Sequence, residues 1–328
     1  MTQGVWFWLR VGILVELAMA GFMAAARPAS APAWVTFALA TTAWPLARAW
    51  RAARGTALRS AVVWGGVAVG LGIGGQVVGW SEPLGLGRPG AGHWAYLATL
   101  ATLASVLSVL NARRPGSGAW ALLMALLVLV FLIPWLEGSG VGGRGGPWAR
   151  LRLETPWTIF YVLLAVMAVS NYLPTRFGLA SLWLALELGL EYLGVTRTAW
   201  PLPWRAAIWS AAPWSLAAAI WTADALSRLP AGGRPGLERL WLWYRDRWGA
   251  VWALRMRERW NRSADILEWP IRLGWYGIVP AHAEVDPTVP DGAEEAFRGL
   301  LRRFAERERI EAAMGRSVSD PCQGSGVG

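Results

Sequence analysis

Three carboxylic acids lie inside long apolar runs of this sequence. Glu16 interrupts the apolar run 11–26. Glu187 and Glu191 lie one helical turn apart in the run 177–194. An ionised side chain at the centre of a lipid bilayer costs at least ~2.5–3.5 kcal/mol, so an acid at that depth is protonated, paired or turned towards water. Such acids line the paths of protons and cations, or they donate hydrogen bonds between helices as neutral groups. The sequence leaves both interpretations open for Glu16, Glu187 and Glu191.

Few side chains are available to neutralise these acids. All 31 basic residues are arginine, and there are two histidines and one cysteine, Cys322. We expect Gln76 and Asn171 to contribute to any polar path through the apolar runs. The spacings of cysteine and histidine that bind zinc or haem are absent from the sequence. The sequence therefore predicts no metal ion and no cofactor, and an enzyme is the less favoured class.

Eight apolar stretches are long enough to cross the hydrocarbon core of a membrane, which takes about 20 helical residues. They are residues 5–26, 33–50, 60–80, 93–111, 118–136, 156–173, 177–194 and 204–226. Many of the 25 tryptophans flank these stretches, as in the aromatic belts at membrane interfaces. The sequence predicts an all-α, polytopic transmembrane bundle of about eight spans over residues 1–229.

Arginine is more frequent in the loops that lie on the same side as the two termini. Arg48, Arg51, Arg54 and Arg59 all surround the connection between the second and third predicted spans. Because basic residues concentrate on the cytosolic side, we expect both termini in the cytosol. The exclusive use of arginine is typical of a GC-rich genome. We expect the bundle to lie in a bacterial cytoplasmic (inner) membrane. The run 11–26 is interpreted as the first span rather than as a cleaved signal peptide.

Glycines at a spacing of four residues mark one face of the third predicted span. Gly66, Gly70 and Gly74 lie on this face. A face without side chains lets another helix backbone approach closely, and such packing drives helix association in lipid. A static packing contact is the preferred interpretation, and a sliding or hinging helix is the alternative.

The region 230–314 is basic, rich in tryptophan and amphipathic. A breaker, PAGGRP at 230–235, precedes a predicted helix over 237–266. Its predicted contact residues are Trp241, Arg245, Arg247, Trp248, Trp252, Arg255 and Arg259. Two positions are open for this helix: in the membrane surface among anionic headgroups, or packed beneath the bundle. We expect mostly irregular chain over 268–290, a second amphipathic helix over 291–314 and a disordered tail over 315–328.

These patterns favour two classes of function. The first is a transporter or channel-like protein for a proton, a cation or a small solute, using the intramembrane carboxylates. The second is a non-catalytic membrane anchor or assembly scaffold whose C-terminal helices bind anionic lipid or a protein partner. Nucleic acid is not expected as a partner, because anionic lipid already accounts for a basic, aromatic helix directly after a membrane span.

Overall fold

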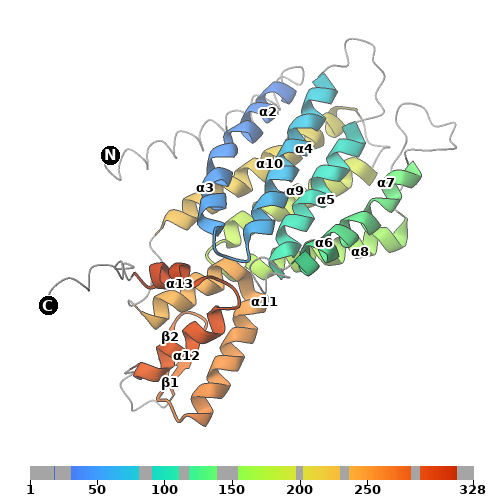
Figure 1. Ribbon diagram of the computed structural model, residues 1–328. Helices are drawn as coiled ribbons and strands as arrows, with labels where there is room; N and C mark the ends of the chain where they lie inside the picture. Colours follow the sequence, from blue (N-terminus) through green and yellow to red (C-terminus); the bar gives the residue numbers. More distant parts are fainter. Residues whose placement is uncertain are drawn as a thin grey trace, which may run out of the picture. The chain divides into compact units, whose positions relative to one another are not determined.

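The computed structural model describes Ala18 and residues 31–80, 91–110, 118–138, 154–196, 202–229, 236–281 and 289–315. These residues are mostly helical, with one two-stranded hairpin (Figure 1). They form two compact units. Unit 1 contains the described residues up to Ala53 and from Leu58 to Leu229, and unit 2 contains Arg54–Ala57 and the described residues from Gly236 onwards. The predicted first span lies outside the described residues except for Ala18, as does the tail from residue 316.

Unit 1 consists of helices that follow the predicted apolar stretches. They are α2 (Ala31–Thr41), α3 (Ala43–Ala53), α4 (Arg59–Trp80), α5 (Ala91–Leu110), α6 (Gly118–Phe131), α7 (Ile133–Gly138), α8 (Thr155–Tyr172), α9 (Gly178–Thr196) and α10 (Leu202–Arg228). Every predicted stretch within the described residues coincides with helix. By length and composition, two described helical stretches suffice to cross a membrane: Arg59–Val78 in α4 and Thr155–Tyr172 in α8.

Two predicted stretches are divided by a proline. Pro45 is the third residue of α3 and Pro134 the second residue of α7. Proline lacks a backbone N–H and fits only the first turn of a helix, so each proline starts a new helix instead of continuing the old one. Stretch 33–50 therefore becomes α2 and α3, and stretch 118–136 becomes α6 and α7.

Two apolar clusters form the core of unit 1. One contains Tyr96, Leu100, Phe131, Tyr161 and Leu188, from α5, α6, α8 and α9. The other packs α2, α4, α5 and α10 together and is built from Val35, Leu39, Ala68, Val69, Ala101, Leu216 and Trp221. Helices α4 and α5 run side by side, as do α9 and α10 (Figure 1). Because α5 contributes to both clusters, it is the central helix of unit 1.

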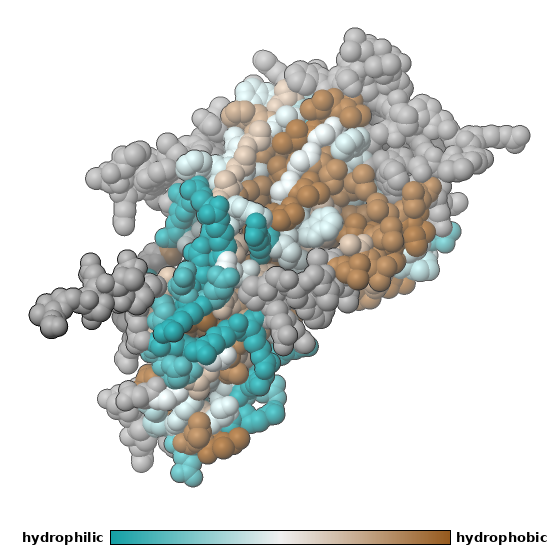
Figure 2. All heavy atoms as spheres, in the orientation of Figure 1, coloured by the Kyte–Doolittle hydropathy of each residue, from teal (hydrophilic) through white to brown (hydrophobic). Residues whose placement is uncertain are grey.

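The outward faces of several unit 1 helices are apolar. Leu122, Leu126 and Leu129 of α6 are exposed by 57–73%, and Leu163 and Val166 of α8 by about as much. Figure 2 shows apolar residues gathered over α6 and α8. Polar side chains are buried in the same unit: Thr99, Thr102, Ser108, Asn171, Ser181, Glu187, Ser215 and Asp224. Unit 1 thus reverses the usual distribution of a water-soluble domain, which rarely exposes large contiguous apolar patches.

The close helix contact of α4 is made by Gly74 and by glycines outside the predicted set. A Cβ atom at Gly74 would lie 2.9 Å from the Trp94 ring of α5, and one at Gly72 would lie 3.2 Å from Leu39 of α2. Gly66 and Gly70 are exposed, and no described atom lies within 4 Å of a Cβ placed there. The packing predicted for these two positions is therefore not made by any described residue, because the face of α4 that meets α2 and α5 is rotated away from them.

Unit 2 is built around one long, bent helix. It contains α11 (Leu237–Ile266), β1 (Ile271–Leu273), β2 (Ile278–Pro280), α12 (Asp291–Leu301) and α13 (Arg307–Met314). Helix α11 bends at Gly249, whose φ of 76° and ψ of −175° are not helical. The predicted irregular stretch contains the antiparallel β1–β2 hairpin, with Arg272 opposite Val279. The prediction of a single helix over 291–314 is wrong, because this stretch forms two helices, α12 and α13.

Aromatic side chains form the core of unit 2. Trp241, Tyr244 and Trp248 of α11 are completely buried. Tyr244 stacks on Trp248 with ring centroids 5.1 Å apart, and its edge meets Phe304 at 5.1 Å. Phe297 of α12 packs against Trp241 at 6.3 Å. The apolar face of α11 is therefore covered by unit 2 itself, through α12, α13 and β1.

Candidate functional site

Glu187 is the most unusual side chain of unit 1. It lies midway along α9 and is 1% exposed. The Thr102 hydroxyl of α5 donates a long hydrogen bond of 3.4 Å to Glu187 Oε1. The other carboxyl oxygen, Oε2, is buried and has no hydrogen-bond partner among the described residues. A buried polar atom without a partner is rare in folded proteins and calls for a functional or a ligand-related explanation.

Further polar side chains lie along α9 and in the first half of α8. Glu191 is one turn further along α9 and is half-buried. The Tyr161 hydroxyl donates to the Leu188 carbonyl at 2.8 Å, and its ring stacks on Tyr192 at 5.5 Å. The Tyr192 hydroxyl lies 3.4 Å from Thr158 Oγ1 in the first turn of α8. We call this set of polar groups on α5, α8 and α9 the Glu187 cluster: Thr102, Thr158, Tyr161, Glu187, Glu191 and Tyr192.

The structure does not bring the other predicted polar residues to this cluster. Glu16 lies outside the described residues. Asn171 is buried near the end of α8, beyond the contact between Ser181 and the Val169 carbonyl. Six residues of α9 separate Ser181 from Glu187, which is about 9 Å along the helix axis. Asn171 and Glu187 therefore belong to different levels of the bundle.

Gln76 has a structural role that the sequence pattern did not reveal. Pro213 lies inside α10 and has no N–H to donate to the Trp209 carbonyl four residues earlier. The Gln76 side chain of α4 donates a 3.4 Å hydrogen bond to this carbonyl instead. An unpaired carbonyl inside a helical bundle is costly. Gln76 therefore compensates for the proline, which explains a polar side chain in an apolar helix.

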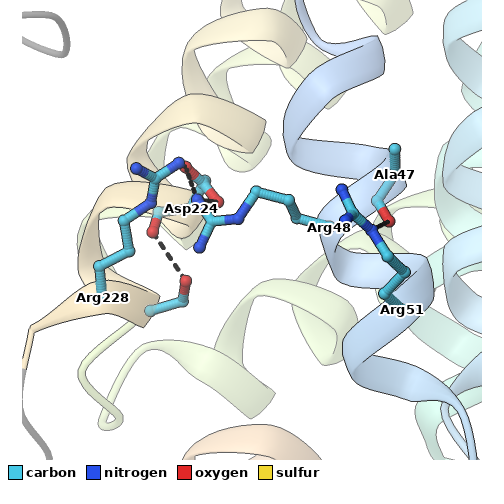
Figure 3. Close-up of polar contacts among 6 residues, drawn as sticks. Ala47, Arg48, Arg51, Asp224 and Arg228 are labelled. Carbon is cyan, nitrogen blue, oxygen red and sulfur yellow. Dashed lines mark hydrogen bonds and ion pairs between the residues drawn. The ribbon is translucent and has the colours of Figure 1, made fainter. Parts of the chain in front are cut away.

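A second buried acid, Asp224, was not singled out from the sequence. Its side chain is 6% exposed and lies between two arginines, Arg48 of α3 and Arg228 of α10 (Figure 3). Arg48 Nη1 is 3.1 Å from Asp224 Oδ1, and Arg228 forms a close ion pair one turn along the same helix. The only sequence signal for this cluster is the spacing of four between Asp224 and Arg228. The Asp224 cluster ties the middle of α3 to the end of α10.

The predicted contact residues of α11 divide into buried and exposed groups. Trp241, Trp248 and Trp252 are buried in the core of unit 2. Arg245 is also buried, where it pairs with Asp246 and donates to the Trp275 carbonyl at 2.8 Å. Arg247 lies over the Trp243 ring at 5.3 Å. Arg255 and Arg259 are exposed. The contact with lipid or with a partner stays a prediction, and the exposed arginines are the residues placed to make it.

Within the described parts of the chain, no three histidine, cysteine, aspartate or glutamate residues are grouped so as to hold a metal ion. Carboxyl and hydroxyl oxygens, the groups of the Glu187 cluster, can in general exchange a proton or coordinate a cation. No family model, curated protein or solved structure matches this chain.

The pairing of Gln76 with Pro213 predicts a specific double-mutant result. Gln76→Leu leaves the Trp209 carbonyl unpaired and should lower the free energy of unfolding by about 1–3 kcal/mol. In a Pro213→Ala background the helix regains its own N–H donor, so the same change should cost close to nothing. The four proteins are compared by thermal unfolding in detergent. An equal cost of Gln76→Leu in both backgrounds contradicts this role.

The Asp224 cluster predicts a large loss of stability on removal of its acid. Asp224→Ala leaves two arginines without their shared partner and should cost on the order of 2–4 kcal/mol, below the full value for a buried pair because the Arg48 side chain is 33% exposed. Glu258→Ala is the matched control. The Glu258 and Arg262 side chains are 72% exposed, so it should cost below about 1 kcal/mol. Similar unfolding midpoints for the two variants would refute the prediction.

Proposed function

We propose that this chain is an integral membrane protein whose helical bundle carries a proton or a small cation by way of Glu187. The observation on which the proposal rests is the buried Glu187 carboxyl, whose Oε2 has no partner among the described residues, inside a bundle with apolar outer faces. In lipid, an ionisable group at such a depth faces the bundle interior and marks a path for ions or protons.

The distribution of side chains supports the membrane location. Hydrocarbon is a favourable solvent for the exposed leucine, valine and phenylalanine side chains of α6 and α8, which water would disfavour. Two buried hydroxyls donate hydrogen bonds to carbonyls of their own helices. Thr99 donates to the Ala95 carbonyl and Ser215 to the Ala211 carbonyl, at 2.9 and 2.8 Å. We propose that α4, α5, α8, α9 and α10 each cross the membrane and that α2–α3 and α6–α7 each cross as a broken pair, with residues 5–26 as the first span.

The chain segments that make up unit 2 support an even number of membrane crossings between them. Arg54–Ala57 and the residues from 236 onwards form one compact unit, so both lie in one aqueous compartment. The chain between them must then cross the membrane an even number of times. Our assignment gives six crossings, by α4, α5, α6–α7, α8, α9 and α10. Because Arg48, Arg51 and Arg59 flank this compartment, we assign it to the cytosol of a bacterium.

The Glu187 cluster supplies the groups that proton or cation transfer needs. A neutral Glu187 carboxyl holds one proton, and its ionised form holds a cation with help from the Thr102 hydroxyl. Glu191, one turn away and half-buried, offers a second carboxyl. The Tyr192 and Thr158 hydroxyls continue the cluster towards the start of α8. Ionisable and polar side chains that follow one another in space are the usual components of proton relays in transporters.

The alternative is a membrane anchor whose unit 2 binds anionic lipid or a protein partner. The observation that favours it is that unit 2 has its own aromatic core and also presents the exposed Arg255 and Arg259. Arginine binds phosphate through a planar fork of donors. In this alternative Glu187 only stabilises the bundle.

Flux measurements distinguish the two functions. The full chain is reconstituted in liposomes, and proton entry is followed with a trapped pH-sensitive dye under an imposed membrane potential; sodium and potassium gradients are tested separately. Glu187→Gln keeps the shape but cannot release a proton, so flux should fall at least tenfold. Glu154→Gln changes an exposed acid at the start of α8 and should leave flux unchanged. Equal flux through both variants, or none through the unaltered chain, favours the anchor.

Side-specific labelling tests the crossings independently of flux. Single cysteines replace Arg54, Glu154 or Glu258, all of which are exposed, in a Cys322→Ser background. A membrane-impermeant maleimide should label the first and third positions from the cytosolic side and Glu154→Cys from the opposite side, because α8, α9 and α10 separate Glu154 from Glu258. Labelling of all three from one side contradicts the proposed topology.

A further inference from the structure

Unit 2 contains a pairing between two segments that are far apart in the sequence. Thr56 and Ala305 form an antiparallel β-bridge. The Ala57 N–H donates to the Phe304 carbonyl at 2.9 Å, and the Glu306 N–H donates to the Gly55 carbonyl at 2.8 Å. Arg309 Nε adds a 2.7 Å hydrogen bond to the Arg54 carbonyl. The segment Arg54–Ala57 is thus bound as a short strand, in the way that a peptide is bound by strand addition.

The segment that binds it is fixed in the core of unit 2. The Phe304 ring contacts Tyr244, Trp248 and Trp252 of α11, with centroid distances of 5.1 to 5.9 Å. Thr56 and Ala305 are 4% and 1% exposed. The pairing is therefore part of the packed core of unit 2.

Gly55 makes the recognition selective. Its φ is +70°, a conformation that residues with a side chain rarely adopt. A Cβ atom there would also lie 2.6 Å from Glu306 Oε2. The backbone conformation therefore favours glycine at this position, and any larger residue would also have to displace the exposed Glu306 side chain.

The bound segment is also the connection between α3 and α4 of unit 1. Helix α3 ends at Ala53 and α4 begins at Arg59. Within unit 1, the Asp224 cluster joins the middle of α3 to the last turns of α10, and these are the two helices after which the chain enters unit 2. Unit 1 thus holds α3 through Arg48, and unit 2 holds the segment that follows α3.

We propose that unit 2 recognises Arg54–Ala57 as a bound segment and that this recognition couples unit 2 to α3 and α4. Coupling of this kind is reciprocal, so a partner or ligand that stabilises unit 2 also stabilises the ends of these two helices. The inference goes beyond the proposed function and does not depend on transport.

A designed disulfide tests the recognition in the full chain. The flanking hydrogen bonds make Thr56 and Ala305 a non-hydrogen-bonded pair, with Cα atoms expected about 4.5 Å apart, within the range of a disulfide. In a Cys322→Ser background, Thr56→Cys with Ala305→Cys should cross-link under mild oxidation at least tenfold faster than Thr56→Cys with Gly299→Cys. Gly299 is the matched control, because no described atom lies within 4 Å of a Cβ atom placed there. Equal rates overturn the recognition.

Hydrogen exchange tests the coupling. Closing the disulfide should slow amide exchange at least threefold in residues 49–53 and 59–63, and leave α8 unchanged. Gly55→Val should speed exchange in the same two stretches, whereas Gly299→Val should not. Exchange in the two stretches that is unaffected by closing the disulfide overturns the coupling, even if Gly55→Val does not fold. Since neither assay measures flux, these outcomes are separate from those of the transport experiment.

Discussion

Unit 1 depends on one constraint: its helices expose apolar side chains and bury polar ones, so every buried polar group needs a partner from within the bundle. Thr99 and Ser215 satisfy this constraint with carbonyls of their own helices. Gln76 satisfies it for a neighbouring helix, at the carbonyl that Pro213 leaves free. For Glu187 Oε2 the described residues provide no such partner. The missing partner, and not burial alone, is the reason for assigning a role to this carboxyl.

Unit 2 obeys the opposite rule, that of a domain in water. Most of its aromatic side chains are buried, and most of its arginines are exposed or pair with acids. Burial also raises the pKa of the Tyr244 hydroxyl well above its usual range, so this group stays neutral and packs as an apolar ring. The two units thus use tryptophan and arginine differently, although they belong to one chain.

The apolar runs were sufficient to predict the helices of unit 1, because a run of about 20 apolar residues without alternation leaves few other structures. The PAGGRP breaker likewise stands where the chain passes from one unit to the other. The contacts between helices could not be predicted from the sequence. The Asp224 cluster and the choice of Gly72 and Gly74 over Gly66 depend on how helices are rotated about their axes, which a pattern in one segment does not contain. The sequence also could not show where the α11 tryptophans are buried, because an amphipathic helix can bury its apolar face in lipid or in its own domain.

The pairing of Thr56 with Ala305 has a consequence for biosynthesis. About 250 residues separate the two strands, and a ribosome adds roughly 5–20 residues per second. On the order of 10–50 s therefore pass between the synthesis of Arg54–Ala57 and the synthesis of the segment that binds it. The rest of unit 1 is made during this interval. Until Phe304 emerges, the aromatic face of α11 also lacks part of its cover. Unit 2 is completed last during translation, and during this interval its uncovered aromatic side chains are a target for a chaperone.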